Sequence, residues 1–132
     1  MNRIMKNKYS IVVLILVSIS LFSCSPKLAG TWKIVKYEIN EPGKPVLILK
    51  DIGTLKLKKN GEGEKNIRYT ALGKEHSDNS KLGWYVTGPY IGIESPGSEF
   101  SKTWVMLVHK KKEQKWKTTD GTNKVQIMEL KK

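Results

Sequence analysis

Cysteine is nearly absent from this chain, which has a single copy, Cys24, in 132 residues. A lone cysteine cannot form a disulfide within the chain, so a small fold stapled by internal disulfides is excluded. Proline and phenylalanine are also scarce, with five and two copies. Long amphipathic helices, internal repeats and low-complexity blocks are missing. The length of the chain is enough for one small domain.

Residue groupings that would support catalysis or metal binding are missing as well. Of the two histidines, His109 ends an apolar segment and is followed by lysines, which suits a solvated strand end. His76 lies near Glu75 and Asp78, which could join it on a metal, although a polar loop explains the same residues. Since no nucleophile–base pair or carboxylate pair stands out, we expect no enzymatic activity, no cofactor and no bound metal.

Acidic residues are half as frequent as basic ones, with 12 against 24. The first 23 residues hold three of the basic residues and none of the acidic ones, so the remaining 109 residues carry a net charge of +9. Such an excess favours anionic surfaces such as lipid headgroups or acidic glycans. It also disfavours inhibition of a basic enzyme such as lysozyme.

The long apolar run is confined to the amino-terminal region. A basic start is followed by apolar residues 11–20, which is the order of parts of a signal peptide. The run is shorter than the ~20 residues that a resident transmembrane helix needs. Leu21-Phe22-Ser23-Cys24 resembles the bacterial lipobox, which implies cleavage before Cys24 and lipid attachment to its thiol.

This resemblance places the protein in the cell envelope, anchored to a membrane by lipid on Cys24. Ser25 and Pro26 follow the cysteine. An aspartate at this place would suggest retention in the inner membrane, and there is none. We therefore expect the outer membrane, facing the periplasm. Nucleic acid is not an expected partner of an exported protein. The expected organisation is a removed signal peptide (1–23), a lipidated amino terminus and tether (24–29) and one domain (30–132).

The domain is predicted to be all-β, because short β-branched and aromatic segments alternate with turn signals. In the first segment the apolar phase changes near Ile34, which predicts a bulge or bend. Asn60-Gly61 predicts a type I′ hairpin turn. Residues 71–83 read as a polar loop, and residues 125–130 also fit one helical turn. About eight strands are expected, at 30–39, 46–49, 53–59, 62–70, 84–86, 90–93, 103–109 and 125–130.

Gly30 and Trp32 form a Gly-x-Trp pattern at the start of the first predicted strand. The domain thereby resembles lipocalins. The resemblance implies a small antiparallel up-and-down β-barrel of about eight strands, with Trp32 as a structural plug at one end. In that family a basic residue from a late strand commonly covers the tryptophan ring. Lys131 and Lys132 lie nearest the expected position, while Arg68 is the only arginine after the signal peptide.

The same resemblance implies a cavity for a small hydrophobic molecule, since a barrel of this size can hold one such guest. Trp84, Tyr85 and Tyr90 cluster around a turn and are candidates for ligand contact at the barrel mouth, as is Trp104. Packing in a dry core is the competing interpretation for all four. Strands this short could also fill the interior with their own side chains.

Residues 110–117 concentrate lysines around one tryptophan between two predicted strands. We interpret this segment as a hairpin end that contacts a membrane surface, because lysines are attracted to anionic lipid and a tryptophan ring suits the headgroup layer. The alternative is a solvated turn whose tryptophan folds onto the core. The residues concerned are Lys110, Lys111, Lys112, Lys115, Trp116 and Lys117.

The leading functional hypothesis is a non-enzymatic, lipid-anchored barrel that binds a small hydrophobic or amphipathic ligand in the cell envelope. The alternative hypothesis is an envelope interaction protein, either a complex subunit or a hydrolase inhibitor. Such a protein would act through its outer surface and would have a packed core.

Overall fold

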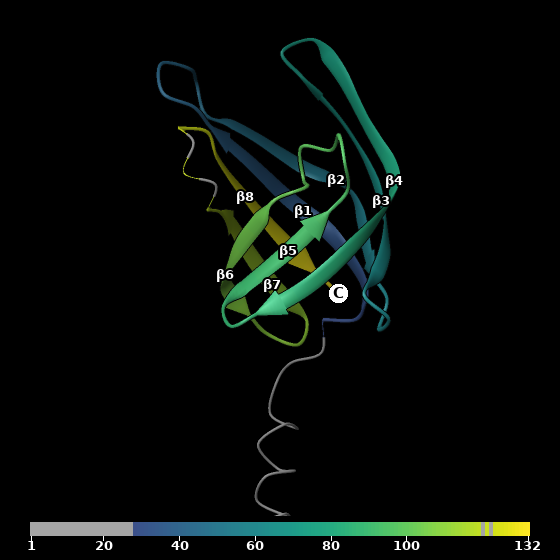
Figure 1. The fold of residues 1–132 in the computed structure, drawn as a ribbon. Helices are drawn as coiled ribbons and strands as arrows, with labels where there is room; N and C mark the ends of the chain where they lie inside the picture. Colours follow the sequence, from purple (N-terminus) through teal and green to yellow (C-terminus); the bar gives the residue numbers. More distant parts are fainter. Residues whose placement is uncertain (1–27, 120, 122) are drawn as a thin grey trace, which may run out of the picture.

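The computed structural model describes residues 28–119, 121 and 123–132 (Figure 1). The predicted signal peptide and the lipid site at Cys24 lie outside the described residues.

Val125–Lys131 forms a strand, which settles its ambiguity between helix and strand. The strands are β1 (Gly30–Asn40), β2 (Leu47–Leu57), β3 (Glu62–Ala71), β4 (Lys74–Thr87), β5 (Tyr90–Glu94), β6 (Thr103–His109), β7 (Glu113–Thr118) and β8 (Val125–Lys131).

These strands form a closed antiparallel barrel in which each strand pairs with its neighbours in the chain. Pairing of β1 with β8 closes the barrel, with Ile34 opposite Leu130 and Tyr37 opposite Met128. The predicted fold class, an all-β barrel of about eight antiparallel strands, is therefore confirmed. Closure also removes most of the free sheet edges that an open sheet would present.

The barrel has two different ends, which we call the closed end and the open end (Figure 1). The closed end carries Leu28, the β2–β3, β4–β5 and β6–β7 turns, and the carboxyl terminus, at the bottom of the view. The open end carries the β1–β2 turn, the tip of the β3–β4 hairpin and the segment 95–102 between β5 and β6. The candidate site described below lies at the open end.

The predicted bend in the first strand is confirmed. The register of β1 shifts between Ile34 and Lys36 against both of its neighbours, β2 and β8. Opposite this point, Asp51 in β2 adopts a positive φ of 51°. A bulge of this kind bends a strand and increases its twist, which lets a short strand curve around a small barrel.

The type I′ turn lies at a different hairpin from the one that the sequence predicts. At the β2–β3 turn only Gly61 has a positive φ, and Lys58 pairs with Glu62 through hydrogen bonds, so the type I′ prediction for Asn60-Gly61 is wrong. The turn is a three-residue loop with glycine in the left-handed region. At the tip of the β3–β4 hairpin, Leu72 and Gly73 both have positive φ (53° and 74°), which is the type I′ pattern.

The segment 71–83 is not the polar loop that its composition suggests. Residues 74–83 belong to β4 and pair with the whole length of β3, from Ala71 opposite Lys74 to Glu62 opposite Gly83. Only the first part of β3, up to Ile67, also pairs with β2. The far part of the hairpin therefore extends beyond the barrel wall, at the top of Figure 1.

The interior between the two ends is packed with side chains. Trp32, Trp104 and Trp116 are each fully buried there. Aliphatic residues fill the space around them, and together these groups form one continuous core that also includes Leu28. Close packing of this kind favours the packed-core interpretation for the middle of the barrel and limits any guest to its ends. The aliphatic members are Ile34, Ile39, Ile52, Leu55, Leu57, Ile67, Leu82, Ile91, Ile93, Met128 and Leu130.

Candidate functional site

Trp32 closes one end of the barrel. Its side chain is fully buried, and its indole N–H donates a hydrogen bond to the Leu28 carbonyl at 2.8 Å. The Lys132 ammonium lies 4.9 Å from the centroid of the ring and donates to the Ala29 carbonyl. A Cβ on Gly30 would lie 2.8 Å from Lys132 Cε, so only glycine leaves room for this lysine. Of the two carboxyl-terminal lysines, Lys132 is thus the one that covers the ring.

The four aromatic residues expected to contact ligand do not meet at a barrel mouth. Trp104 is fully buried in the core. Trp84 is half-buried near the closed end, where its indole N–H donates to the carbonyls of Lys58 and Glu62. Tyr85 and Tyr90 are exposed on the outside of the barrel. Three of these residues lie near the β4–β5 turn and the fourth in the core, and none of the four lines the pocket described below.

The expected membrane contact of residues 110–117 is only partly compatible with the structure. Trp116 is fully buried in β7, and its indole N–H donates to the side-chain carbonyl of Gln114, so its ring cannot reach a headgroup layer in this conformation. Lys115 and Lys117 lie on the strand itself. Lys110, Lys111 and Lys112 do form an exposed turn, the one between β6 and β7. The tryptophan folds onto the core because alternation along β7 points it inward.

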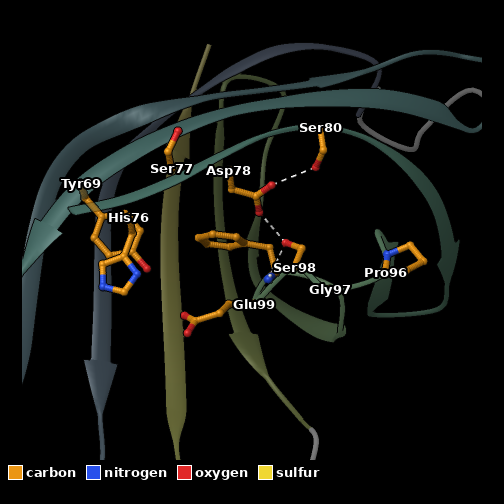
Figure 2. Close-up of a pocket in the computed structure, with 10 residues that line it drawn as sticks. Tyr69, His76, Ser77, Asp78, Ser80, Pro96, Gly97, Ser98 and Glu99 are labelled. Atoms are coloured by element: carbon orange, nitrogen blue, oxygen red, sulfur yellow. Dashed lines mark hydrogen bonds between the residues drawn. The ribbon is translucent and has the colours of Figure 1, made fainter. Parts of the chain in front are cut away.

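The open end carries a hollow that we call the mouth pocket, with a volume of about 270 Å³. It lies between the β3–β4 hairpin and the segment 95–102 (Figure 2). The hairpin contributes side chains from β3 and β4, and the segment contributes the turn at residues 96–100. Figure 2 shows the pocket residues around the Asp78 carboxylate, which are Tyr69, His76, Ser77, Asp78, Ser80 and residues 96–100.

Asp78 is held in place by a hydrogen-bond network at the floor of this pocket. Ser98 donates to its Oδ2 at 2.6 Å and Ser80 donates to its Oδ1 at 2.9 Å. Burial alone would raise the pKa of this carboxyl. The two hydroxyl hydrogen bonds and the nearby charge of Lys65 outweigh that effect and lower the pKa below its usual value. The carboxylate is therefore fixed in its ionised form.

Beneath Asp78 lies Lys65, whose side chain is fully buried in the barrel. Its ammonium donates to Ser80 Oγ at 2.9 Å and to Ser95 Oγ, and lies 3.4 Å from Asp78 Oδ1. A buried ammonium is tolerated only when its donors are satisfied and an opposite charge is close. Lys65 thus links β3 to β4 and to the segment that follows β5.

Aromatic rings form the side of the pocket that faces β1. Tyr69 and His76 are directly opposite each other in the hairpin, and their rings stack with centroids 4.8 Å apart. Tyr37 meets the Tyr69 ring edge-on and also contacts Phe100. Burial, followed by the charge of Glu99, raises the pKa of Tyr69 to about 12. The phenol therefore stays neutral and can donate a hydrogen bond.

An apolar groove continues from the mouth pocket across the rim of the barrel. A second hollow of about 250 Å³ shares Tyr69, His76 and Glu99 with the pocket. Its other walls include Ile39, Leu47, Ala71 and Leu72, with Glu41, Lys74 and Lys124 at its edges. The open end thus presents a polar hollow and an apolar groove that meet at the Tyr69–His76 pair.

Sequence reasoning missed this site because its key side chains are polar and face inward. The signal was nevertheless present, since Lys65, Ile67 and Tyr69 alternate along β3. Across the turn the inward side chains His76, Asp78, Ser80 and Leu82 alternate in the same way. A period of two that continues through a polar stretch indicates a strand. The type I′ turn at Leu72-Gly73, which lacks the favoured Asn-Gly sequence, concealed the connection.

The other structural findings concern metals and membrane helices. Within residues 28–119, 121 and 123–132, no group of three or more histidine, cysteine, aspartate or glutamate side chains could hold a metal ion. Glu75, a candidate ligand by sequence, instead pairs with Arg68 at 2.6 Å on an exposed surface. None of the described residues forms a helix of the length and apolar character needed to cross a membrane.

Comparison with known proteins adds no family to this description. No protein-family model matches the chain, and no curated protein matches it in sequence. The functional argument therefore depends on the geometry of the open end.

Proposed function

We propose that this protein is a lipid-anchored barrel that binds a small amphipathic ligand at its open end. One observation carries the proposal, namely that the polar mouth pocket and the apolar groove meet at the shared residues Tyr69, His76 and Glu99. A ligand with one polar and one apolar part would fit both hollows at once. Sites that combine apolar walls with a few fixed polar groups are typical of small-molecule binding.

The chemistry of the pocket favours a neutral hydroxylated or a cationic head group. Asp78 and Glu99 are the charged groups that line it, and both are carboxylates. Ser77 and the Tyr69 phenol offer further polar groups beside them. Lys65, the nearest ammonium to Asp78, lies buried beneath the pocket floor. An anionic head group would therefore meet two like charges.

The apolar part of the ligand would lie along the rim, not inside the barrel. The interior below the pocket is occupied by the buried core, which includes Phe100 and Ile67. The groove offers Ile39, Leu47 and the highly exposed Leu72 in its place. A short alkyl chain or a ring is thus a better fit than a long acyl chain.

The anchor and the location are part of the same proposal. Lipid on Cys24 would hold the barrel at a membrane of the cell envelope. The proposed location is the periplasmic face of the outer membrane. The Leu21-Phe22-Ser23-Cys24 sequence supports this part. Replacing Cys24 by alanine should abolish palmitate labelling of the protein, and labelling at the level of the unchanged chain would refute the anchor.

Binding can be tested with amphiphiles that share a ten-carbon chain and differ in head group. We expect decylamine and a decyl glycoside, added below their micelle-forming concentrations, to shift the amide NMR signals of the β3–β4 hairpin and of residues 95–102. Decanoate should bind at least several-fold more weakly. Signals of the closed end should not move.

Matched variants locate the site. Tyr69→Ala should weaken decylamine binding by about tenfold, because one wall of both hollows is lost. Tyr90→Ala removes an exposed tyrosine from the outside of the barrel and should leave binding unchanged. Equal effects of the two variants, or shifts spread evenly over the barrel, would contradict a site at the open end.

A further inference from the structure

The described chain begins at the closed end of the barrel. Leu28 is buried there under the Trp32 indole, and Ala29 accepts a hydrogen bond from Lys132. Cys24 precedes Leu28 by four residues, and a fully extended chain advances at most ~3.6 Å per residue. If Cys24 carries lipid, as the proposed function holds, the closed end is kept within about 14 Å of the bilayer surface.

The same end concentrates exposed positive charge. Two of its turns and the carboxyl terminus carry lysines, while the exposed acids near this end, among the described residues, include Glu62, Glu94 and Glu113. Lys132 N donates to the Lys112 carbonyl, which brings the carboxyl terminus against the β6–β7 turn. Lysines near an anionic lipid surface are attracted to it. Besides Lys132, which covers Trp32, the exposed lysines of these turns and of the carboxyl terminus are Lys59, Lys110, Lys111, Lys112 and Lys131.

Exposed apolar side chains lie beside this basic surface. Val86 and Tyr90 flank the β4–β5 turn, and each keeps 43% of its surface exposed. Leu107, which is 52% exposed, lies at the bulge of β6 next to that turn, where Met106 N donates to the Pro89 carbonyl. Tyrosine and short apolar side chains suit the boundary between headgroups and hydrocarbon.

We propose that the closed end is a docking surface for an anionic lipid bilayer and that it orients the barrel with its ligand site pointing away from the membrane. Three independent observations support this: the place where the described chain starts, the exposed lysines, and the exposed apolar side chains of Val86, Tyr90 and Leu107. Trp116 takes no part, because it is buried. The surface is thus wider than the β6–β7 turn alone.

Thr87 and Thr70 form a matched pair of probe positions. Both are exposed threonines in strands, Thr87 at the closed end and Thr70 in the extended hairpin. The lipidated protein with Thr87→Cys or Thr70→Cys would be labelled with an environment-sensitive dye, since the lipid blocks the Cys24 thiol. It would then be reconstituted in vesicles of phosphatidylglycerol and phosphatidylcholine that contain nitroxide-labelled lipid.

We expect quenching at Thr87 to exceed quenching at Thr70 at least threefold, and to fall at high salt because salt screens the lysines. Exchanging Lys59, Lys110, Lys111, Lys112 and Lys131 for glutamine should reduce this excess to the salt-insensitive part that the Cys24 tether alone supplies. The control variant exchanges five exposed lysines elsewhere on the barrel and should retain it. These are Lys44, Lys50, Lys74, Lys81 and Lys117.

Equal quenching at both positions, or stronger quenching at Thr70, would overturn the orientation. So would a dimer in which the Thr87 label is shielded with or without vesicles, because the surface would then be occupied by a second copy. Flotation with vesicles of phosphatidylcholine alone reports the Cys24 anchor. Amphiphile binding reports the open-end site, so each part of the proposal can fail separately.

Discussion

At the scale of single residues, Lys65 is the side chain on which most of the mouth pocket depends. It is an ammonium with no surface in contact with water, and it joins Asp78, Ser80 and Ser95. Removing the ammonium takes away the positive charge beside the partly buried Asp78 and the donor to the buried Ser95, and loss of one partner of a buried ion pair is strongly destabilising.

Lys65→Ala should therefore lower the free energy of unfolding by about 3 kcal/mol. Lys81→Ala, which removes an exposed lysine from the neighbouring strand, should change it by less than about 0.5 kcal/mol. Urea denaturation of both variants of the mature chain measures the difference. A Lys65 variant as stable as the Lys81 variant would mean that water replaces the ammonium at no cost.

Asp78 makes stability depend on pH. Its pKa is lower in the folded chain than the ordinary value, so the ionised form stabilises the fold fully above the unfolded pKa of about 4, and this contribution is lost as pH falls toward the lower folded pKa. The stability difference between the unchanged chain and Asp78→Asn should thus be largest near pH 7 and shrink below pH about 4.

Thermal unfolding between pH 7 and pH 3 tests this expectation. Glu75→Gln is the control, because the ion pair between Glu75 and Arg68 is exposed and contributes little. Its curve should run parallel to that of the unchanged chain. A difference for Asp78→Asn that stays constant with pH would show that its carboxyl is not the group that titrates.

At the scale of elements, the β3–β4 hairpin is the part of the fold with the strongest local conflict. Its type I′ turn places Leu72 at a φ of 53°, a conformation that costs a bulky residue about 1–2 kcal/mol. Leu72 is also 83% exposed, so burial does not offset that cost. Violations of this kind concentrate at functional sites, and Leu72 lines the proposed ligand groove.

Leu72→Asn should raise stability by about 1 kcal/mol, since Asn-Gly is the favoured type I′ sequence. The same change should weaken binding of decylamine by removing apolar surface from the groove. Leu72→Ala is the control, because it removes the surface while keeping a poor turn residue. A variant that is stabilised and binds as before would show that Leu72 has no part in the site.

The hairpin also shows where prediction from sequence succeeded and where it stopped. The alternating Leu55 and Leu57 predict a strand at 53–59 because its inner face is hydrophobic, but the structure joins this segment and the predicted strand 46–49 into one strand, β2. The closed end was anticipated from Gly30 and Trp32. The open end was not, because His76, Asp78 and Ser80 are polar and face inward. The position of the Asp78 carboxylate depends on Lys65 and Ser98, which are distant in sequence, and composition alone carries no such information.

At the scale of the whole molecule, a small contact between segments far apart in sequence lies beside the β1–β8 pairing that closes the barrel. Gly30 has a φ of 138°, and the Lys132 side chain occupies the space where a Cβ would lie. The contact joins the first residue of β1 to the residue after β8. The lysine that covers Trp32 therefore lies directly beside the β1–β8 pairing.

Gly30→Ala should lower the free energy of unfolding by about 2 kcal/mol, from backbone strain and displacement of Lys132. Gly43→Ala is the control, because Gly43 also has a positive φ (76°) but no atom within 4 Å of an added Cβ. Guanidinium unfolding followed by tryptophan fluorescence compares them. Equal losses would show that displacement of Lys132 adds nothing to the strain.

The extension of the hairpin past the barrel wall has a consequence for solubility. Between Lys74 and Leu82, β4 pairs with β3 alone among the described residues, so part of its other side is a strand edge to which another chain could add. That stretch carries the charged side chains Lys74, Glu75 and Lys81, which disfavour such pairing. If Cys24 carries lipid, as proposed, the protein would be concentrated on a membrane and would need this protection. Charge-to-valine changes at these three positions should promote fibrillar aggregation.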